Sequence, residues 1–237
     1  RMGIPVGDLA GGSNCVTAIA AALYRREKTG KGCLLAVSLL DSLVGMLTYI
    51  TQMYEATGII PPPAGSGHQV VFPYMVVDTA DQPLVLAIFV EKFWGLLCRA
   101  MDREAWIDDP RFARNDDRVA HREILEPALR ARFAEKTAAA WMELLVEHQV
   151  PAAPVHNIGQ VMANPQLLHQ QMVVDIPDGA GGSVRTLGCP IKTPGVPSAP
   201  VGPAPELDQH AAEVLQQWLG LTPDEANDAL DAREERR

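Results

Sequence analysis

The sequence predicts an α/β protein in three parts: a helical first segment, a smaller α+β domain and a returning C-terminal segment. Three observations predict it, namely helical spacing of apolar residues near the start, strand-like runs followed by helical patterns in the middle, and a proline-dense stretch near the end. Hydrophobic residues make up 47% of the 237 residues and charged residues 21%. This composition is typical of a folded protein with one sizeable core or two modest ones.

The first predicted helix covers residues 12–28. Val16, Ile19 and Leu23 recur there at helical spacing among alanines that permit close packing, so the helix is expected to be buried. The glycines that follow, beginning at Gly30, supply the left-handed backbone that commonly ends a helix.

A short strand over residues 34–38 and a helix over residues 40–56 are predicted next. The helix carries a broad apolar stripe and is expected to end at Gly58; the stripe comprises Leu40, Leu43, Val44, Leu47 and Ile50. Residues 61–67 combine three prolines with two glycines and read as an interdomain linker. The first segment is therefore assigned to residues 1–60.

The small α+β domain is assigned to residues 61–165. Residues 70–77 and 84–89 have the character of strands, and helical patterns follow over residues 91–101, 117–133 and 137–147.

The return segment is assigned to residues 166–237. Glycines at 179–182 and prolines over 190–205 indicate an extended path. Two helices are expected to close the chain, one over residues 208–219 and one after Thr222, where Thr222 and Glu225 have the spacing of a capping box.

Charge and cysteine usage exclude several classes of function. The net charge of -9 and the absence of a basic cluster argue against nucleic acid as a partner. The four cysteines form no CxxC pair and the six histidines no HxxxH spacing, so no metal site is expected and the cysteines are expected to be reduced. No apolar run of about 18 residues and no signal peptide is recognised, so we expect no membrane partner and a cytoplasmic location.

Two familiar catalytic motifs are not present. A Walker A loop needs a glycine where Arg25 stands and Ser or Thr where Gly32 stands. No GxSxG elbow for a nucleophilic serine occurs either.

Asp8 stands among glycines just before the first predicted helix. On one interpretation its carboxylate caps the helix, and capping aspartates are commoner than catalytic ones. On the other, Gly7, Gly11 and Gly12 bring bare backbone close to a substrate and leave Asp8 free to attack a carbonyl as a nucleophile. The six residues from Gly7 to Gly12 leave both interpretations open.

A wider pattern resembles the family III CoA-transferases, also called CaiB/BaiF. The segments that carry the resemblance are Pro5-Val6-Gly7-Asp8-Leu9-Ala10-Gly11-Gly12, Ala22-Leu23-Tyr24-Arg25-Arg26-Glu27-Lys28-Thr29-Gly30-Lys31-Gly32, Val37-Ser38-Leu39-Leu40-Asp41, His68 before Pro73-Tyr74, Asp109-Pro110-Arg111-Phe112 with Arg118, and Val150-Pro151-Ala152-Ala153-Pro154-Val155. The likeness covers nearly the whole chain in order.

The resemblance implies that Asp8 is the catalytic carboxylate in the transfer of coenzyme A from an acyl-CoA to a carboxylic acid. Aspartyl anhydride and aspartyl-CoA thioester intermediates would form, with CoA as a substrate and no tightly bound cofactor. It also implies that a glycine-rich loop covers the site. Gly65, Ser66, Gly67 and His68 occupy that place, and a plain linker is the alternative. Asp109, Arg111 and Arg118 are expected to form a structural polar network.

The sequence also departs from the family pattern. Cys33 stands where glutamine is usual, Ala36 where aspartate is usual and Gln82 where a turn glycine is usual. The N-terminal CoA-binding half is missing, which makes residues 1–60 a remnant of the large domain. Relatives form interlocked dimers, so we expect a homodimer or a complex with a missing N-terminal half, and partial exposure of the apolar helices over 12–56.

Two other functions are kept as alternatives. An α-methylacyl-CoA racemase of the same superfamily would use Asp8 with a histidine upstream of this chain. An inactive truncated or scaffold subunit would only dimerise or support another chain.

Overall fold

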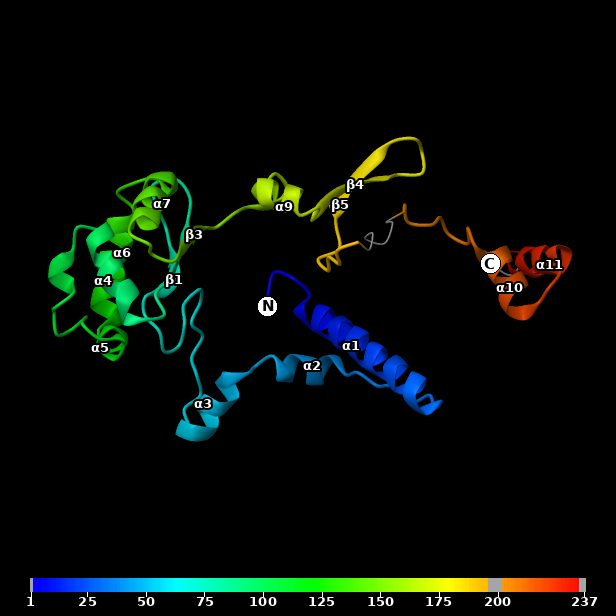
Figure 1. Ribbon diagram of the computed structural model, residues 1–237, viewed down its shortest axis with the longest axis horizontal. Helices are drawn as coiled ribbons and strands as arrows, with labels where there is room; N and C mark the ends of the chain where they lie inside the picture. Colours follow the sequence, from blue (N-terminus) through cyan, green and yellow to red (C-terminus); the bar gives the residue numbers. More distant parts are fainter. Residues whose placement is uncertain (1, 196–201, 235–237) are drawn as a thin grey trace. The chain divides into compact units, whose positions relative to one another are not determined.

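A computed structural model describes residues 2–195 and 202–234, and the chain divides into two compact units, Arg1–Pro154 and Val155–Arg237 (Figure 1). Helices and strands both occur in each unit. The predicted mixture of α and β structure is confirmed.

The first helix is longer than predicted. Helix α1 runs over Val6–Thr29, so Gly7 to Gly12 are helical rather than a turn ahead of the helix. Pro5 precedes the helix with φ -76°, and its carbonyl accepts the first helical hydrogen bond from the Leu9 N–H at 3.0 Å. Gly30 ends the helix as predicted, with φ 68° and its N–H bonded to the Arg26 carbonyl at 2.8 Å.

Helix α1 was expected to be buried, but only Ala10 and Gly11 are, and Val16 is 65% exposed. An 18-residue window of α1 has a mean hydropathy of 1.2, which by length and composition is enough to cross a membrane. The expectation that no such stretch exists was therefore wrong by this measure. Length and composition are weak support for a membrane span, because a core helix of a soluble protein has the same properties.

The helix predicted over residues 40–56 is broken in two. Helix α2 covers Leu39–Gly45 and helix α3 covers Tyr49–Thr57, and between them Thr48 has a φ of 47°. A β-branched residue with positive φ cannot continue a helix. Gly58 ends α3 in the left-handed conformation, as predicted.

The strand predicted over residues 34–38 does not form. Leu34 is 96% exposed, and a strand needs a neighbouring strand to satisfy its backbone. Among the described residues, no strand pairs with this segment.

A three-stranded antiparallel sheet forms the centre of the α+β part, in the order β1-β2-β3. The strands are β1 (Tyr74–Val77), β2 (Leu84–Ala87) and β3 (Ala152–Pro154), and Tyr74 lies opposite Ala87. The two predicted strands are confirmed with shorter bounds. The helices of this part are α4 (Glu91–Ala100), the 3-10 helix η1 (Glu104–Trp106), α5 (Asn115–Ala120), α6 (Arg122–Phe133) and α7 (Ala138–Glu147).

The helix predicted over residues 117–133 is interrupted at His121, where α5 ends and α6 begins. One continuous hydrophobic core joins the sheet to α4, α6 and α7 and includes fully buried Leu86, Leu97, Leu129, Phe133 and Trp141.

Arg118 is 1% exposed inside this core. Its guanidinium donates to the carbonyls of Phe72 at 2.8 Å and Phe112 at 3.0 Å, pairs with Glu91 at 2.9 Å and lies over the Trp94 ring at 4.9 Å. These contacts give Arg118 the structural role expected from the sequence.

Asp109 and Arg111 form a separate local pair. Arg111 Nη2 lies 2.7 Å from Asp109 Oδ2, and hydrogen bonds from the Arg111 side chain and backbone lower the pKa of Asp109 to about 2.

The second unit contains a hairpin that the sequence did not predict. Strands β4 (Val173–Pro177) and β5 (Ser183–Leu187) pair antiparallel across the glycine-rich turn, where Asp178 accepts from the N–H groups of Ala180 and Gly182. The remaining helices are α8 (Ile158–Met162), α9 (Pro165–His169), α10 (Ala211–Leu219) and α11 (Pro223–Glu234).

The capping box at the start of α11 is confirmed. The Thr222 N–H donates to Glu225 Oε2 at 2.8 Å, and the Glu225 N–H donates to Thr222 Oγ1 at 3.3 Å. Part of the extended path predicted over residues 190–205 lies outside the described residues, which exclude 196–201.

Replacing Arg118 tests its structural role. Arg118→Met leaves the Phe72 and Phe112 carbonyls buried without a donor, so we expect the free energy of unfolding to fall by about 3 kcal/mol. Urea unfolding followed by tryptophan fluorescence measures the loss. Arg99→Met, at an exposed position on α4, is the control and should change stability by less than about 0.5 kcal/mol. Equal effects of the two variants would contradict the role assigned to Arg118.

Candidate catalytic site around Asp8

Asp8 lies in the first turn of α1 and its side chain is exposed. No side chain caps this end of the helix, and the first N–H groups of a helix have no acceptor within it. The N-terminus also carries the positive end of the helix dipole. A carboxylate here is stabilised in its ionised form and remains accessible, two properties that a carboxylate nucleophile needs.

Gly7 and Gly11 lie on the face of α1 that contacts α2. A Cβ atom at Gly7 would lie 3.3 Å from Leu43 Cδ1, and one at Gly11 would clash with the Leu39 side chain. The Asn14 side-chain amide donates to Ser42 Oγ at 3.0 Å in the same contact. These glycines therefore let the two helices approach closely, a function that the sequence alone did not reveal.

Gly12 has a different environment, because a Cβ atom there would meet nothing within 4 Å. Contact of Gly7, Gly11 and Gly12 with coenzyme A stays a prediction. Helix packing already accounts for two of the three glycines.

The loop formed by Gly65, Ser66, Gly67 and His68, called here the 65–68 loop, lies along β1. Gly65 takes a left-handed φ of 59°. The Gly67 N–H donates to the Ala64 carbonyl at 2.8 Å, which closes a turn. These bonds make the segment an ordered loop rather than the plain linker that composition also allowed.

Side chain and backbone both attach this loop to the strand. Ser66 Oγ accepts from the Val76 N–H at 3.2 Å, and the His68 N–H donates to the Tyr74 carbonyl at 3.1 Å. The His68 ring stacks between the rings of Tyr49 and Tyr74. In the described part of the chain, no hydrogen bond or ion pair joins the loop to Asp8.

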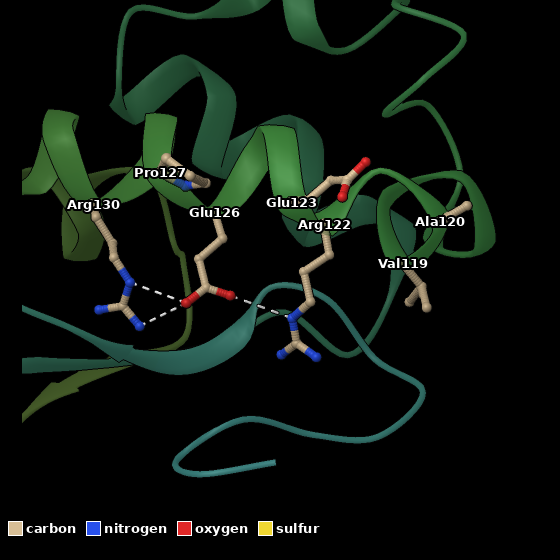
Figure 2. A pocket seen from close by; sticks show the side chains of 7 residues that line it. All are labelled: Val119, Ala120, Arg122, Glu123, Glu126, Pro127 and Arg130. Atoms are coloured by element: carbon tan, nitrogen blue, oxygen red, sulfur yellow. Dashed lines mark hydrogen bonds and ion pairs between the residues drawn. The ribbon is translucent and has the colours of Figure 1, made fainter. Parts of the chain in front are cut away.

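A surface groove of about 630 Å³ lies on α6, lined by Val119, Ala120, Arg122, Glu123, Glu126, Pro127 and Arg130. Figure 2 shows Arg122, Glu126 and Arg130 pointing the same way from α6. Glu126 pairs with both arginines, at 3.4 Å and 2.8 Å. Arg130 also donates to the Val76 carbonyl at 3.2 Å.

Arg122 extends from this groove to the 65–68 loop, where a Cβ atom at Gly67 would lie 2.6 Å from its Nη2. The three charged side chains thus brace β1 and the loop. The i,i+4 spacing of Arg122, Glu126 and Arg130 was the available signal in the sequence, and it was not used.

Cysteine and metal chemistry have little support. Burial raises the pKa of the Cys98 thiol to about 12, so it is not a thiolate nucleophile at neutral pH. No cluster of His, Cys, Asp or Glu that could hold a metal ion occurs within residues 2–195 and 202–234.

Comparison with protein families identifies the fold to which this site belongs. The family model described as CoA-transferase family III matches residues 1–211, a range that includes Asp8 and the 65–68 loop. This chain belongs to CoA-transferase family III. The resemblance noted in the sequence is confirmed.

Two curated relatives show how much of a family III protein is in hand. The chain is 34% identical over 221 residues to succinyl-CoA:mesaconate CoA-transferase of Haloarcula hispanica. It is 30% identical over 217 residues to acetyl-CoA:oxalate CoA-transferase of Acetobacter aceti. The matches cover 92% and 91% of this chain but 54% of each relative, so the family III chain spans about half their length.

A solved structure supports the same assignment. The crystal structure of a CaiB/BaiF family protein from Brucella suis matches with a TM-score of 0.76 at 28% identity. The match covers 90% of this chain and 55% of that one. The family III fold is therefore shared over most of the present chain.

The different surroundings of two neighbouring glycines give a matched test of the α1–α2 contact. Gly12→Ala should raise the free energy of unfolding by about 1 kcal/mol, because alanine favours a helix and has open space there. Gly11→Ala adds a methyl group against Leu39, which offsets that gain. Urea unfolding followed by far-ultraviolet circular dichroism should place Gly11→Ala about 1 kcal/mol or more below Gly12→Ala. Equal stabilisation would contradict the contact.

Proposed function

We propose that the complete protein containing this chain transfers coenzyme A from an acyl-CoA to a carboxylic acid, with Asp8 as the nucleophile. The observation that carries the proposal is the family match across Asp8, which stands exposed at an uncapped helix N-terminus. Family membership supports CoA transfer in general, and the assignment of Asp8 rests on its position in the motif and its surroundings.

In the first half of the proposed reaction, an Asp8 carboxylate oxygen attacks the thioester carbonyl of the acyl-CoA. The C–S bond breaks, the CoA thiolate leaves, and a mixed anhydride remains on Asp8. The thiolate then attacks the Asp8 carbonyl carbon and releases the donor acid, leaving an aspartyl-CoA thioester.

The second half reverses these events with a new acid. The acceptor carboxylate attacks the aspartyl thioester and displaces the CoA thiolate, forming a second anhydride. Attack of the thiolate on the acceptor carbonyl gives the new acyl-CoA and restores the Asp8 carboxylate. Each step develops negative charge on a carbonyl oxygen, and amides without a helical partner in the first turn of α1 are donors suited to it.

The names of the two relatives narrow the first substrates to test. Mesaconate and oxalate, named as acceptors for those proteins, are dicarboxylic acids. We therefore propose a dicarboxylic acid as the acceptor and succinyl-CoA or acetyl-CoA as the donor. The homodimer, or complex with an N-terminal half, and the cytoplasmic location expected from the sequence belong to the same proposal.

Racemisation of an α-methylacyl-CoA is the weaker candidate, because both relatives are named as transferases. The two reactions differ in their products. Transfer moves CoA to a new acid, whereas racemisation exchanges the α-proton for deuterium in D₂O and leaves the acyl group on CoA.

Asp8→Asn in the complete protein should abolish transfer. We expect the rate of CoA exchange between succinyl-CoA and a dicarboxylic acid to fall about a thousandfold or more, because the amide is a poor nucleophile. The fold should be unchanged, since the Asp8 side chain is exposed. Chromatographic separation of the CoA esters measures exchange, and hydroxylamine should trap Asp8 as a hydroxamate during turnover.

Glu27→Gln provides the control, because Glu27 is an exposed carboxylate at the other end of the same helix. Its exchange rate should match that of the unaltered protein. Undiminished exchange in Asp8→Asn would overturn the role of Asp8.

A further inference from the structure

Three aromatic rings from separate parts of the chain stack on one another around the 65–68 loop. The His68 ring lies 5.7 Å from the Tyr49 ring at an interplanar angle of 18°, and 5.6 Å from the Tyr74 ring at 19°. Both separations fall in the range of favourable offset stacking. Tyr49 begins α3 and Tyr74 begins β1, so His68 is held from two elements at once.

Hydrogen bonds fix the orientation of the His68 ring. The Val70 N–H donates to His68 Nδ1 at 3.2 Å, and His68 Nε2 lies 2.9 Å from Tyr49 Oη. Because Nδ1 accepts, the proton of the neutral ring is on Nε2, which donates to Tyr49. The ring therefore uses both nitrogens and both faces.

The backbone beside Tyr49 is strained. Thr48 has φ 47° and ψ -122°, which a β-branched residue rarely adopts. Such strain persists only when surrounding contacts hold it, and it concentrates at functional positions. Here it reorients the chain between α2 and α3, immediately before the tyrosine that reaches His68.

The same segment is attached to the helix that carries Asp8. Helix α2 packs on α1 through Leu39 and Leu43, and the side chains of Ser42 and Asn14 are hydrogen-bonded. A continuous series of contacts thus runs from α1 through α2 and α3 to the 65–68 loop. Tyr49 is the residue through which the last contact passes.

We propose that Tyr49, His68 and Tyr74 form an aromatic clamp that fixes the 65–68 loop, with Tyr49 as the positioning residue that ties the loop to the segment bearing Asp8. The proposal rests on the proposed function, in which the loop covers the reacting groups. A fixed loop limits the entry of water. When water attacks an acyl intermediate on Asp8, its oxygen joins the acyl carbon, the bond to Asp8 breaks, and the acid is released without forming a new acyl-CoA.

The clamp can be tested by two measurements on the complete protein, one of which does not depend on activity. Hydrogen exchange at the Gly67 and His68 amides reports how firmly the loop is held. The ratio of acyl-CoA hydrolysis to CoA transfer reports the entry of water.

Tyr49→Leu removes the stacked ring and the hydroxyl, whereas Tyr49→Phe keeps the ring and removes only the hydroxyl. Tyr54→Leu changes another exposed tyrosine of α3 and is the control. We expect Tyr49→Leu to speed amide exchange about threefold to tenfold and to raise the share of hydrolysis. Tyr49→Phe should give a smaller change in the same direction, and Tyr54→Leu no change.

The outcomes separate the clamp from the function on which it rests. Amide exchange unchanged in Tyr49→Leu, or equally faster in Tyr54→Leu, would overturn the clamp. Faster exchange with an unchanged share of hydrolysis would overturn its part in excluding water. If the unaltered protein transfers no CoA, the proposed function fails, and amide exchange alone then decides whether the clamp exists. Should Tyr49→Leu not fold, Tyr49→Phe carries the same test.

Discussion

The buried guanidinium of Arg118 is the constraint on which the α+β part and its loop depend. A charge at 1% exposure is tolerable only because Glu91, two backbone carbonyls and the face of Trp94 surround it. One of those carbonyls belongs to Phe72, just before β1, so Arg118 sets where the strand begins. Every bond that holds the 65–68 loop is then made to β1 or to residues beside it. A buried ion pair in the core thus controls a surface loop through one strand.

The two regions that carry predicted site residues are stabilised in different ways. The α+β part has a continuous core of large side chains, whereas α1 buries only Ala10 and Gly11. Helices α1 and α2 hold together through close approach at glycines and one hydrogen bond. Their apolar side chains stay exposed, as Val16 and Leu40 illustrate. An apolar surface of this kind is typical of one that packs against other protein.

Local signals in the sequence predicted local structure well. The glycine ends of α1 and α3 and the Thr222 capping box depend on a few neighbouring residues, and all three are confirmed. Features that depend on distant partners were missed. The glycines around Asp8 read as a turn, yet they are helical because α2 packs against them. Residues 34–38 have strand-like composition but no partner strand among the described residues, and the Tyr49–His68 contact joins residues that no short motif links.

Strand β1 lies at the edge of its sheet, and an open edge is a template on which another chain can add a strand. Here the outward-facing groups of Tyr74 and Val76 are already bonded, to the His68 N–H, Ser66 Oγ and the Arg130 guanidinium. The loop assigned to substrate shielding therefore also guards against aggregation. Evolution of this loop toward new substrates is limited by that second duty, because each change that loosens it uncovers a sticky edge.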